Sequence, residues 1–89
     1  MEIKVKDILG EDIIIEDAIL LREIIKNDIN SGVLLDFEGF KRIPTTFFNL
    51  LFGDLINNFG RDVIFKNIDV KNLSNYTDYS RVVLGTTFQ

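Results

Sequence analysis

Four residues near the middle of the chain carry side chains that could do chemistry: Asp36, Glu38, Thr45 and Thr46. The two carboxylates are spaced so that they share one face of a strand, and such a pair can act as general acid and general base. The two hydroxyls open the helix predicted to follow. The carboxyl end of a parallel strand that faces a helix N-terminus is where open α/β folds usually place their functional surface.

The same residues also have structural explanations. Asp36 can accept hydrogen bonds from amides of the following loop, Gly39 permits a positive φ, and Thr45 can cap the helix. Pro44 favours the cap, since proline is tolerated at a helix start. We therefore predict that Asp36 and Gly39 organise the turn. No nucleophile or oxyanion site is predicted beside the carboxylates, so we expect no enzyme activity.

The composition excludes several kinds of site. The 89 residues include no cysteine and no histidine, which rules out disulfides, a thiol nucleophile, zinc sites and histidine-based triads. We expect neither a metal nor a cofactor. The net charge is −4 and Lys41 and Arg42 are the only adjacent basic residues. A nucleic-acid partner is not expected, because binding to phosphates requires clustered lysine and arginine.

Length and hydropathy indicate a single domain over residues 1–89. A chain of this size can bury one modest core, and 46% of its residues are hydrophobic. The apolar runs are far shorter than the roughly 20 residues that span a bilayer, so we expect no transmembrane helix and no membrane partner. The first residues lack a basic region followed by an apolar signal core, so a cytoplasmic location is expected.

The apolar pattern predicts an α/β fold of order β(β)αβαβα, with a mixed, mostly parallel sheet of about four strands and helices packed on it. Strands are expected at residues 3–8, 13–15, 32–37 and 62–67, and the second is expected to pair with the first as a hairpin. The strand at 32–37 is almost continuously apolar, which is typical of a central parallel strand covered on both faces.

Three helices are expected between and after these strands. The first has Asp17 as its N-cap. The second runs from about residue 45 to 59 with a wide apolar stripe, and Leu50 is expected to be exposed among small and polar residues. The last is expected over about 70–83 with Asp69 as its N-cap. Its predicted inner face consists of Leu73, Tyr76, Thr77, Ser80 and Leu84.

The middle of the chain resembles a known family. The run Leu-Asp-Phe-Glu-Gly at 35–39, followed by Ile-Pro-Thr-Thr-Phe-Phe-Asn-Leu-Leu-Phe-Gly at 43–53, is similar to the small bacterial STAS-like domains. Their strand ends in Asp-Phe-x-Gly, and their next helix has a serine-rich start and a Phe-Ala-Asp-x-Leu-Phe-Gly form. The match is clearest over 32–59, and residues 65–70 resemble the family's third strand and the start of its final helix.

The resemblance implies a sheet with helices on one side and a relationship to anti-sigma factor antagonists. In those relatives a partner kinase phosphorylates a serine at the N-terminus of this helix, and the exposed helix face binds that partner. By position, Thr46 matches the serine and Thr45 the residue before it, so both are candidate phosphoacceptors. A phosphate there would carry a charge of about −1.5 to −2, which the helix dipole favours and an acidic partner surface repels.

Two residues depart from the phosphorylated pattern. Pro44 stands where an aspartate usually precedes the hydroxyl pair, and Phe47 stands where a glycine usually follows it. A bulky phenylalanine could crowd a kinase active site. We therefore expect the helix to bind a partner without the phosphorylation switch.

The leading hypothesis is a non-catalytic protein-binding module that resembles an anti-sigma factor antagonist. Its contact residues would be Lys41, Arg42, Asn49 and Leu50, together with the two threonines. The resemblance implies a histidine-kinase-like ATPase or another regulator as the partner, and we expect the domain to be a monomer or a weak homodimer.

Two other hypotheses come from different classes. The main alternative is a small-molecule or nucleotide site at the carboxyl ends of the strands, near Asp36, Glu38 and Thr45. It lacks a glycine-rich phosphate loop. The other is an acidic inhibitor that mimics nucleic acid, against which the modest net charge and the interspersed basic residues count.

Overall fold

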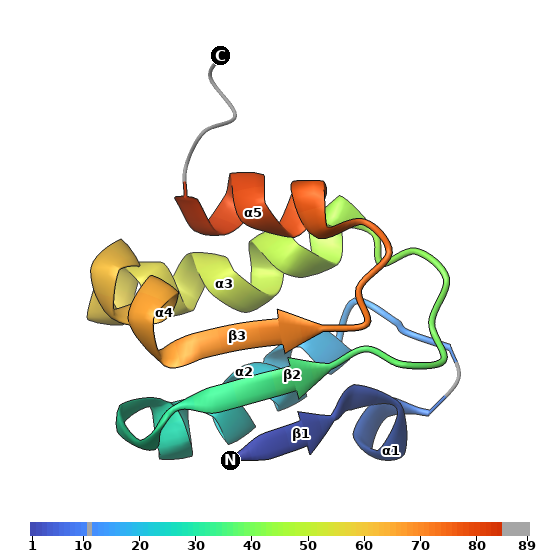
Figure 1. Cartoon of the computed structure of the whole chain (residues 1–89), viewed down its shortest axis with the longest axis horizontal. Coiled ribbons are helices and arrows are strands. Elements are labelled where there is room, and N and C mark those ends of the chain that lie inside the picture. The colour runs from blue at the N-terminus through green and yellow to red at the C-terminus, as the bar shows by residue number, and fades with distance from the viewer. Residues whose placement is uncertain (11, 85–89) are drawn as a thin grey trace.

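Three short parallel strands and five α-helices make up the described part of the chain, which is residues 1–10 and 12–84 of a computed structural model. In chain order the elements are β1 (Glu2–Lys4), α1 (Val5–Leu9), α2 (Asp17–Asp28), the 3-10 turn η1 (Ile29–Ser31), β2 (Val33–Asp36), α3 (Thr45–Phe59), α4 (Arg61–Asn67), β3 (Ile68–Lys71) and α5 (Tyr76–Leu84). Figure 1 shows their arrangement. Within these residues, no helix is both long enough and apolar enough to cross a membrane.

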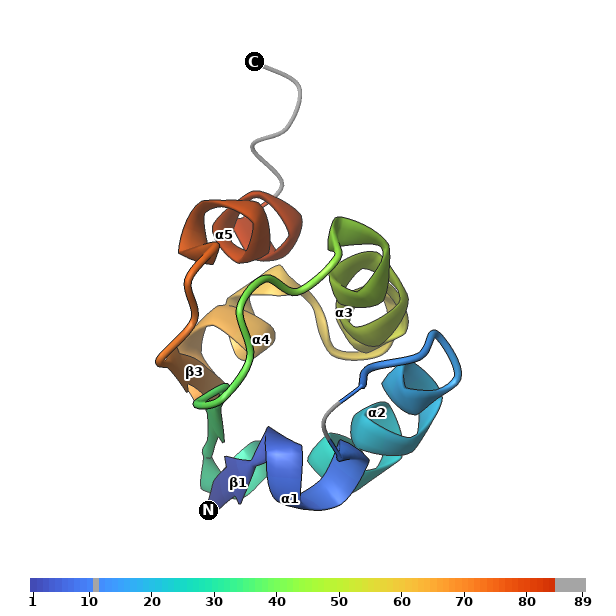
Figure 2. The ribbon, with the colours of Figure 1, turned by 90° about the vertical axis from the view of Figure 1, so that its right-hand side faces the viewer.

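The sheet has the order β1-β2-β3, so the strand predicted to be central is indeed β2. Viewed along the strands, the helices lie on one side of the sheet (Figure 2). Because side chains alternate along a strand, one set points away from the helices, and we call this set the outer face. The outer face consists of Glu2, Lys4, Leu34, Asp36, Asp69 and Lys71. The prediction that helices cover both faces of β2 was therefore wrong.

The core lies between the other face of the sheet and the helices, and α3 contributes most of its bulk. The stripe predicted on α3 is confirmed, since its fully buried residues are Phe47, Phe48, Leu51, Phe52 and Leu55. The ring of Phe48 lies 6.2 Å from that of Phe37 after β2 and 5.9 Å from that of Tyr79 on α5. These aromatic contacts join the sheet, α3 and α5.

The N-terminal part of the chain differs from the predicted hairpin. The first strand ends at Lys4, and the next residues form α1, in which Val5 is buried and Leu9 packs on the core one turn later. Residues 13–15 form no strand, and Ile14 and Ile15 are exposed. Over so few residues the apolar pattern fits both a strand and one helical turn. The described residues therefore contain three strands and not four, and none of them is antiparallel.

Residues 61–67 form α4, whereas a strand was predicted at 62–67. Gly60, with a φ of 87°, ends α3, and its carbonyl accepts a hydrogen bond from the Ile64 amide (3.2 Å). Ile64 is buried while its neighbour Phe65 is 58% exposed. The β-branched residues favour a strand by propensity, but in the structure Ile64 is the buried residue of a short helix, and Ile68 has an extended backbone. The third strand accordingly begins only at Ile68.

The last helix is shorter than predicted and buries a different face. It begins at Tyr76, while Asp69 lies in β3 and caps no helix. Tyr79 and Val83 are buried, whereas Tyr76 and Leu84 of the predicted inner face are exposed. Because β3 lies later in the chain than the predicted strand, α5 begins six residues later than predicted and buries a different face.

The other two predicted caps also differ. Asp17 is the first residue of α2, and its carboxylate accepts a hydrogen bond from the Ile14 amide (3.1 Å) in the turn before the helix. At α3 the N-cap position belongs to Pro44, and no side chain caps the helix there. The Pro44 carbonyl accepts the amides of Phe47 and Phe48. Thr45 is therefore the first residue of the helix, with its side chain exposed.

Candidate functional site

Asp36 ends β2 and connects two loops at the carboxyl edge of the sheet. Its side chain is only 4% exposed. Oδ1 accepts one hydrogen bond from the Glu38 amide (3.0 Å) and another from Nδ2 of Asn72 (2.9 Å). Asn72 follows β3 and has a φ of 59°, a left-handed conformation that asparagine tolerates better than most residues. The carboxylate thus holds the loop after β2 against the residue that ends β3.

These hydrogen bonds shift the titration of Asp36. The bond from Asn72 and then that from the Glu38 amide lower the pKa of the Asp36 carboxyl below its ordinary value of 3.8, and partial desolvation opposes them. Nearby Lys71, whose Nζ lies 3.9 Å from Oδ2, and Lys4 lower this pKa further. The ionised form is therefore favoured in the folded state.

A pH dependence of stability follows. Because the pKa of Asp36 is lower in the folded than in the unfolded chain, its contribution is present above about pH 3.8 and is lost as pH falls through the folded value. We expect Asp36→Asn to be less stable than wild type at neutral pH and to lose less stability on acidification. Urea unfolding from neutral to acidic pH measures both effects, with exposed Asp62→Asn as the control.

A direct titration tests the same prediction independently of the variant. The carboxyl carbon resonance of Asp36, followed by NMR in the folded wild type, is expected to titrate with a midpoint below 3.8. A midpoint at or above that value would contradict the assigned hydrogen bonds.

Gly39 occupies the turn after Asp36. Its φ of 96° is one that residues with a Cβ rarely adopt, and a Cβ built there would lie 2.7 Å from Cδ of Lys6. Beside this turn is a cavity of about 310 Å³. Its lining residues are Lys4, Lys6, Asp7, Asp36, Glu38 and Gly39. Among the described residues, no group of three or more acidic residues is placed to hold a metal ion.

The loop before α3 is tied to the start of α5 by Asn75. Its Oδ1 accepts the Ile43 amide (3.1 Å), and its Nδ2 donates to the Ile43 carbonyl (2.7 Å) and to Oδ2 of Asp78 (3.2 Å). Arg42 donates to the same Asp78 oxygen at 2.7 Å. Sequence reasoning missed Asn75 and Asp78, because they lie more than thirty residues from their partners. Arg42, predicted to bind a partner, is thus also an intramolecular ion-pair partner.

The N-terminus of α3 presents both threonines to solvent. Thr45 and Thr46 are exposed, and Lys41 is exposed in the loop before them. Phe47 is fully buried, so its ring points into the core and does not cover the threonines. The ring therefore presents no bulk at the surface, and the expectation that the threonines are not phosphorylated stays a prediction.

The outward face of α3 carries the other predicted contact residues. Asn49 and Leu50 are exposed, Leu50 by 42%. Leu50 lies one turn before Asp54, which forms ion pairs with Arg22 (3.5 Å) and Lys26 (3.2 Å) of α2. Leu50 is therefore on the side of α3 that adjoins α2.

On α2, Ile19 precedes Arg22 by one turn and is 52% exposed. Because α2 and α3 run in the same direction (Figure 1), Ile19 and Leu50 both lie one turn before the ion pairs with Asp54. Ile15, 46% exposed, lies in the turn that precedes α2. We call Ile15, Ile19 and Leu50 the apolar patch. Sequence reasoning found only Leu50, because it assigned Ile15 to a strand and gave Ile19 no contact role in the predicted helix.

Comparison with known families fits this architecture. The family model described as STAS-like domain of unknown function (DUF4325) matches residues 17–78, well over half of the chain, and the chain belongs to this family. The matched segment runs from the start of α2 into α5 and includes Asp36, the threonine pair and Leu50. The resemblance seen in the sequence is thereby confirmed. Searches of curated proteins and of solved structures found no match.

Proposed function

We propose that this STAS-like domain is a non-catalytic module that binds a protein partner through the N-terminal half of α3, the loop before it and the adjoining part of α2. The observation that carries the proposal is the apolar patch: Ile19 and Leu50 are both large, apolar and about half exposed, on adjoining sides of two helices. A single exposed leucine is ordinary, but clustered apolar side chains mark interaction surfaces.

The threonines give this surface a point of regulation. Thr46 lies one turn before Leu50, and a phosphate on either threonine hydroxyl would add negative charge at the rim of the proposed contact. The helix dipole would stabilise that phosphate. A partner with an acidic contact surface would then be released. We propose a histidine-kinase-like ATPase or another regulator as the partner, by analogy with the anti-sigma factor antagonists that the chain resembles.

The test compares the partner affinities of two leucine-to-aspartate variants, one inside the proposed surface and one outside it. The partner is captured from a native lysate with the wild-type domain, identified, expressed and titrated by calorimetry. Leu50→Asp is expected to weaken binding at least about tenfold, because a charge is buried in an apolar contact. Leu20→Asp is the matched control: Leu20 is 49% exposed on α2 and lies about 200° around the helix from Arg22. Equal affinities for the two variants would refute the surface.

A second candidate function rests on the cavity beside Gly39. Lys4 and Lys6 could contact an anionic ligand such as a nucleotide at the carboxyl ends of β1 and β2, but the carboxylates of Asp7, Asp36 and Glu38 line the same cavity and oppose it. A ligand at about 100 times its Kd would stabilise the fold by about 2.7 kcal/mol and raise Tm measurably. Thermal shift against a panel of nucleotides at millimolar concentration decides it, and an unchanged Tm with every nucleotide would exclude this site.

A further inference from the structure

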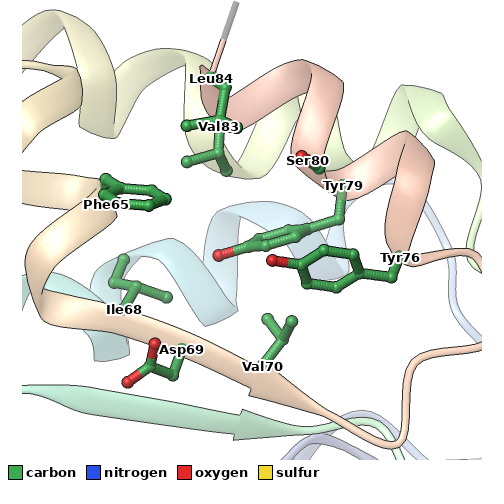
Figure 3. A pocket seen from close by; sticks show the side chains of 9 residues that line it. All are labelled: Phe65, Ile68, Asp69, Val70, Tyr76, Tyr79, Ser80, Val83 and Leu84. Carbon is green, nitrogen blue, oxygen red and sulfur yellow. The ribbon is translucent and has the colours of Figure 1, made fainter.

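A second surface lies between β3 and α5, and α3 separates it from the apolar patch (Figure 2). It is a cavity of about 220 Å³, shown in Figure 3. Phe65 of α4 closes one end, Val70 of β3 forms the floor, and Tyr76 and Tyr79 of α5 stand over it. We call this cavity the β3–α5 groove. The proposed function uses none of these residues.

The free edge of β3 borders the groove. β3 is the last strand in the order β1-β2-β3, and the Phe37 amide donates to the Lys71 carbonyl. Asp69 and Lys71 therefore direct their backbone groups toward β2, and the alternating Val70 directs its N–H and C=O to the open side. No described residue supplies a hydrogen-bond partner for these two groups. This short open edge therefore offers one N–H and one C=O with which an added chain can pair.

The walls of the groove are apolar and aromatic, yet much of their surface is open. Phe65, Tyr76 and Leu84 are 58%, 54% and 44% exposed. Tyr79 is only 5% exposed, and its hydroxyl points into the groove (Figure 3). That hydroxyl has no hydrogen-bond partner among the described residues. Because no fully buried side-chain oxygen or nitrogen of the described residues lacks a partner, this hydroxyl is open to the solvent in the groove, where a polar ligand group can reach it.

The charge of the groove selects among ligands. Asp69 is the one charged residue in the described lining. Burial, and then the nearby Tyr76 and Asp69, raise the pKa of Tyr79, so its hydroxyl is neutral at physiological pH. A carboxylate, a neutral phenol oxygen and aromatic rings together favour a cation: the first two accept its hydrogen bonds, and the ring faces attract its charge.

We propose that the β3–α5 groove binds an extended segment of a partner protein that carries a lysine or arginine side chain. The segment's backbone pairs with the N–H and C=O of Val70. The aliphatic stem of the basic side chain packs against Phe65, and its head group pairs with the Asp69 carboxylate, which lies on the outer face at the rim of the groove. Charge complementarity to Asp69, in a chain of net charge −4, is what identifies the occupant as cationic.

Labelled peptides test the proposal by fluorescence anisotropy. The probe is a blocked seven-residue peptide of alternating valine and lysine, and its matched partner has glutamate in place of every lysine. The lysine peptide is expected to bind saturably and at least about tenfold more tightly than the glutamate peptide. N-methylation of the central valine, which removes one backbone donor, is expected to weaken it. Absence of saturable binding, or equal binding of both peptides, would overturn the proposal.

Variants locate the binding. Asp69→Asn and Phe65→Ala are expected to weaken the lysine peptide about tenfold, whereas Asp62→Asn, an exposed carboxylate on α4 outside the groove, leaves it unchanged. Circular dichroism verifies that each variant is folded. Leu50→Asp is expected to bind the peptide as wild type does, and a loss in that variant would move the peptide to the apolar patch and overturn the assignment.

Light scattering of the free domain measures its oligomeric state and so tests whether a second copy of the chain fills the groove. A stable dimer that Asp69→Asn dissociates would mean that a second copy fills the groove, and this too would overturn the proposal.

Discussion

Replacing Phe48 by alanine is expected to lower the free energy of unfolding by about 3–5 kcal/mol. Phe48 is fully buried, and its ring contacts those of Phe37, Phe52 and Tyr79. The substitution removes the transfer free energy of the ring and leaves a cavity where the sheet, α3 and α5 meet. A domain of this size has a total stability of about 5–10 kcal/mol, so the loss is a large fraction of it.

Urea unfolding followed by circular dichroism measures the change. Phe65→Ala is the matched control, because Phe65 is 58% exposed and its truncation is expected to change stability by no more than about 0.5 kcal/mol. Similar losses for the two variants would contradict the placement of Phe48 at the centre of the core. A variant too unstable to purify is compared by Tm in cell lysate against the same control.

Long elements with a strong pattern were predictable from the sequence. The fifteen residues of α3 repeat their apolar side chains over four turns, and both bounds, Thr45 and Phe59, were predicted as observed. β2 was also identified, because an uninterrupted apolar run between Gly32 and Asp36 is typical of a central parallel strand. Burial of these two elements dominates the core, so local pattern and global fold agree there.

Short elements were predicted poorly, because a few residues cannot separate a strand from one or two helical turns. Residues 5–9 and 61–67 both contain β-branched residues, yet both are helical, and each buries one residue in the core, Val5 or Ile64. Which residue reaches the core depends on the tertiary fold and leaves no local signal. The apolar segment around Ile15 was read as a strand for the same reason.

The candidate surfaces were likewise predicted where they lie on long elements and missed where they depend on short ones. Leu50 was predicted as exposed because α3 was predicted accurately. The predicted contact surface lacked the rest of the apolar patch, in part because Ile15 was assigned to a strand. The β3–α5 groove was missed because the predicted inner face of the last helix included Tyr76, which is exposed, and omitted Tyr79, which is buried. The role of Asn75 depends on a contact 32 residues away, and only its residue type, common in turns, pointed to it.

Replacing Asn75 by alanine is expected to lower the free energy of unfolding by about 1–3 kcal/mol. Its side chain satisfies both the N–H and the C=O of Ile43, a residue that is only 1% exposed, and also donates to Asp78. Alanine leaves two buried backbone groups without partners, which costs more than losing an exposed hydrogen bond. Asn58→Ala is the control, because Asn58 is exposed and bonds only with Asp54 (3.1 Å) on its own helix.

Asn75→Ala also tests how much the loop before α3 contributes to partner binding in the proposed function, because the substitution loosens that loop from α5. Without Asn75, the side-chain polar contact that remains between this loop and α5 among the described residues is the exposed ion pair of Arg42 with Asp78, worth about 0–1 kcal/mol. Partner binding through the loop and α3 is therefore expected to weaken in Asn75→Ala, through a faster dissociation rate. Arg42→Ala is expected to change stability by less than about 1 kcal/mol, so a large loss of affinity in that variant would mean that the guanidinium contacts the partner directly.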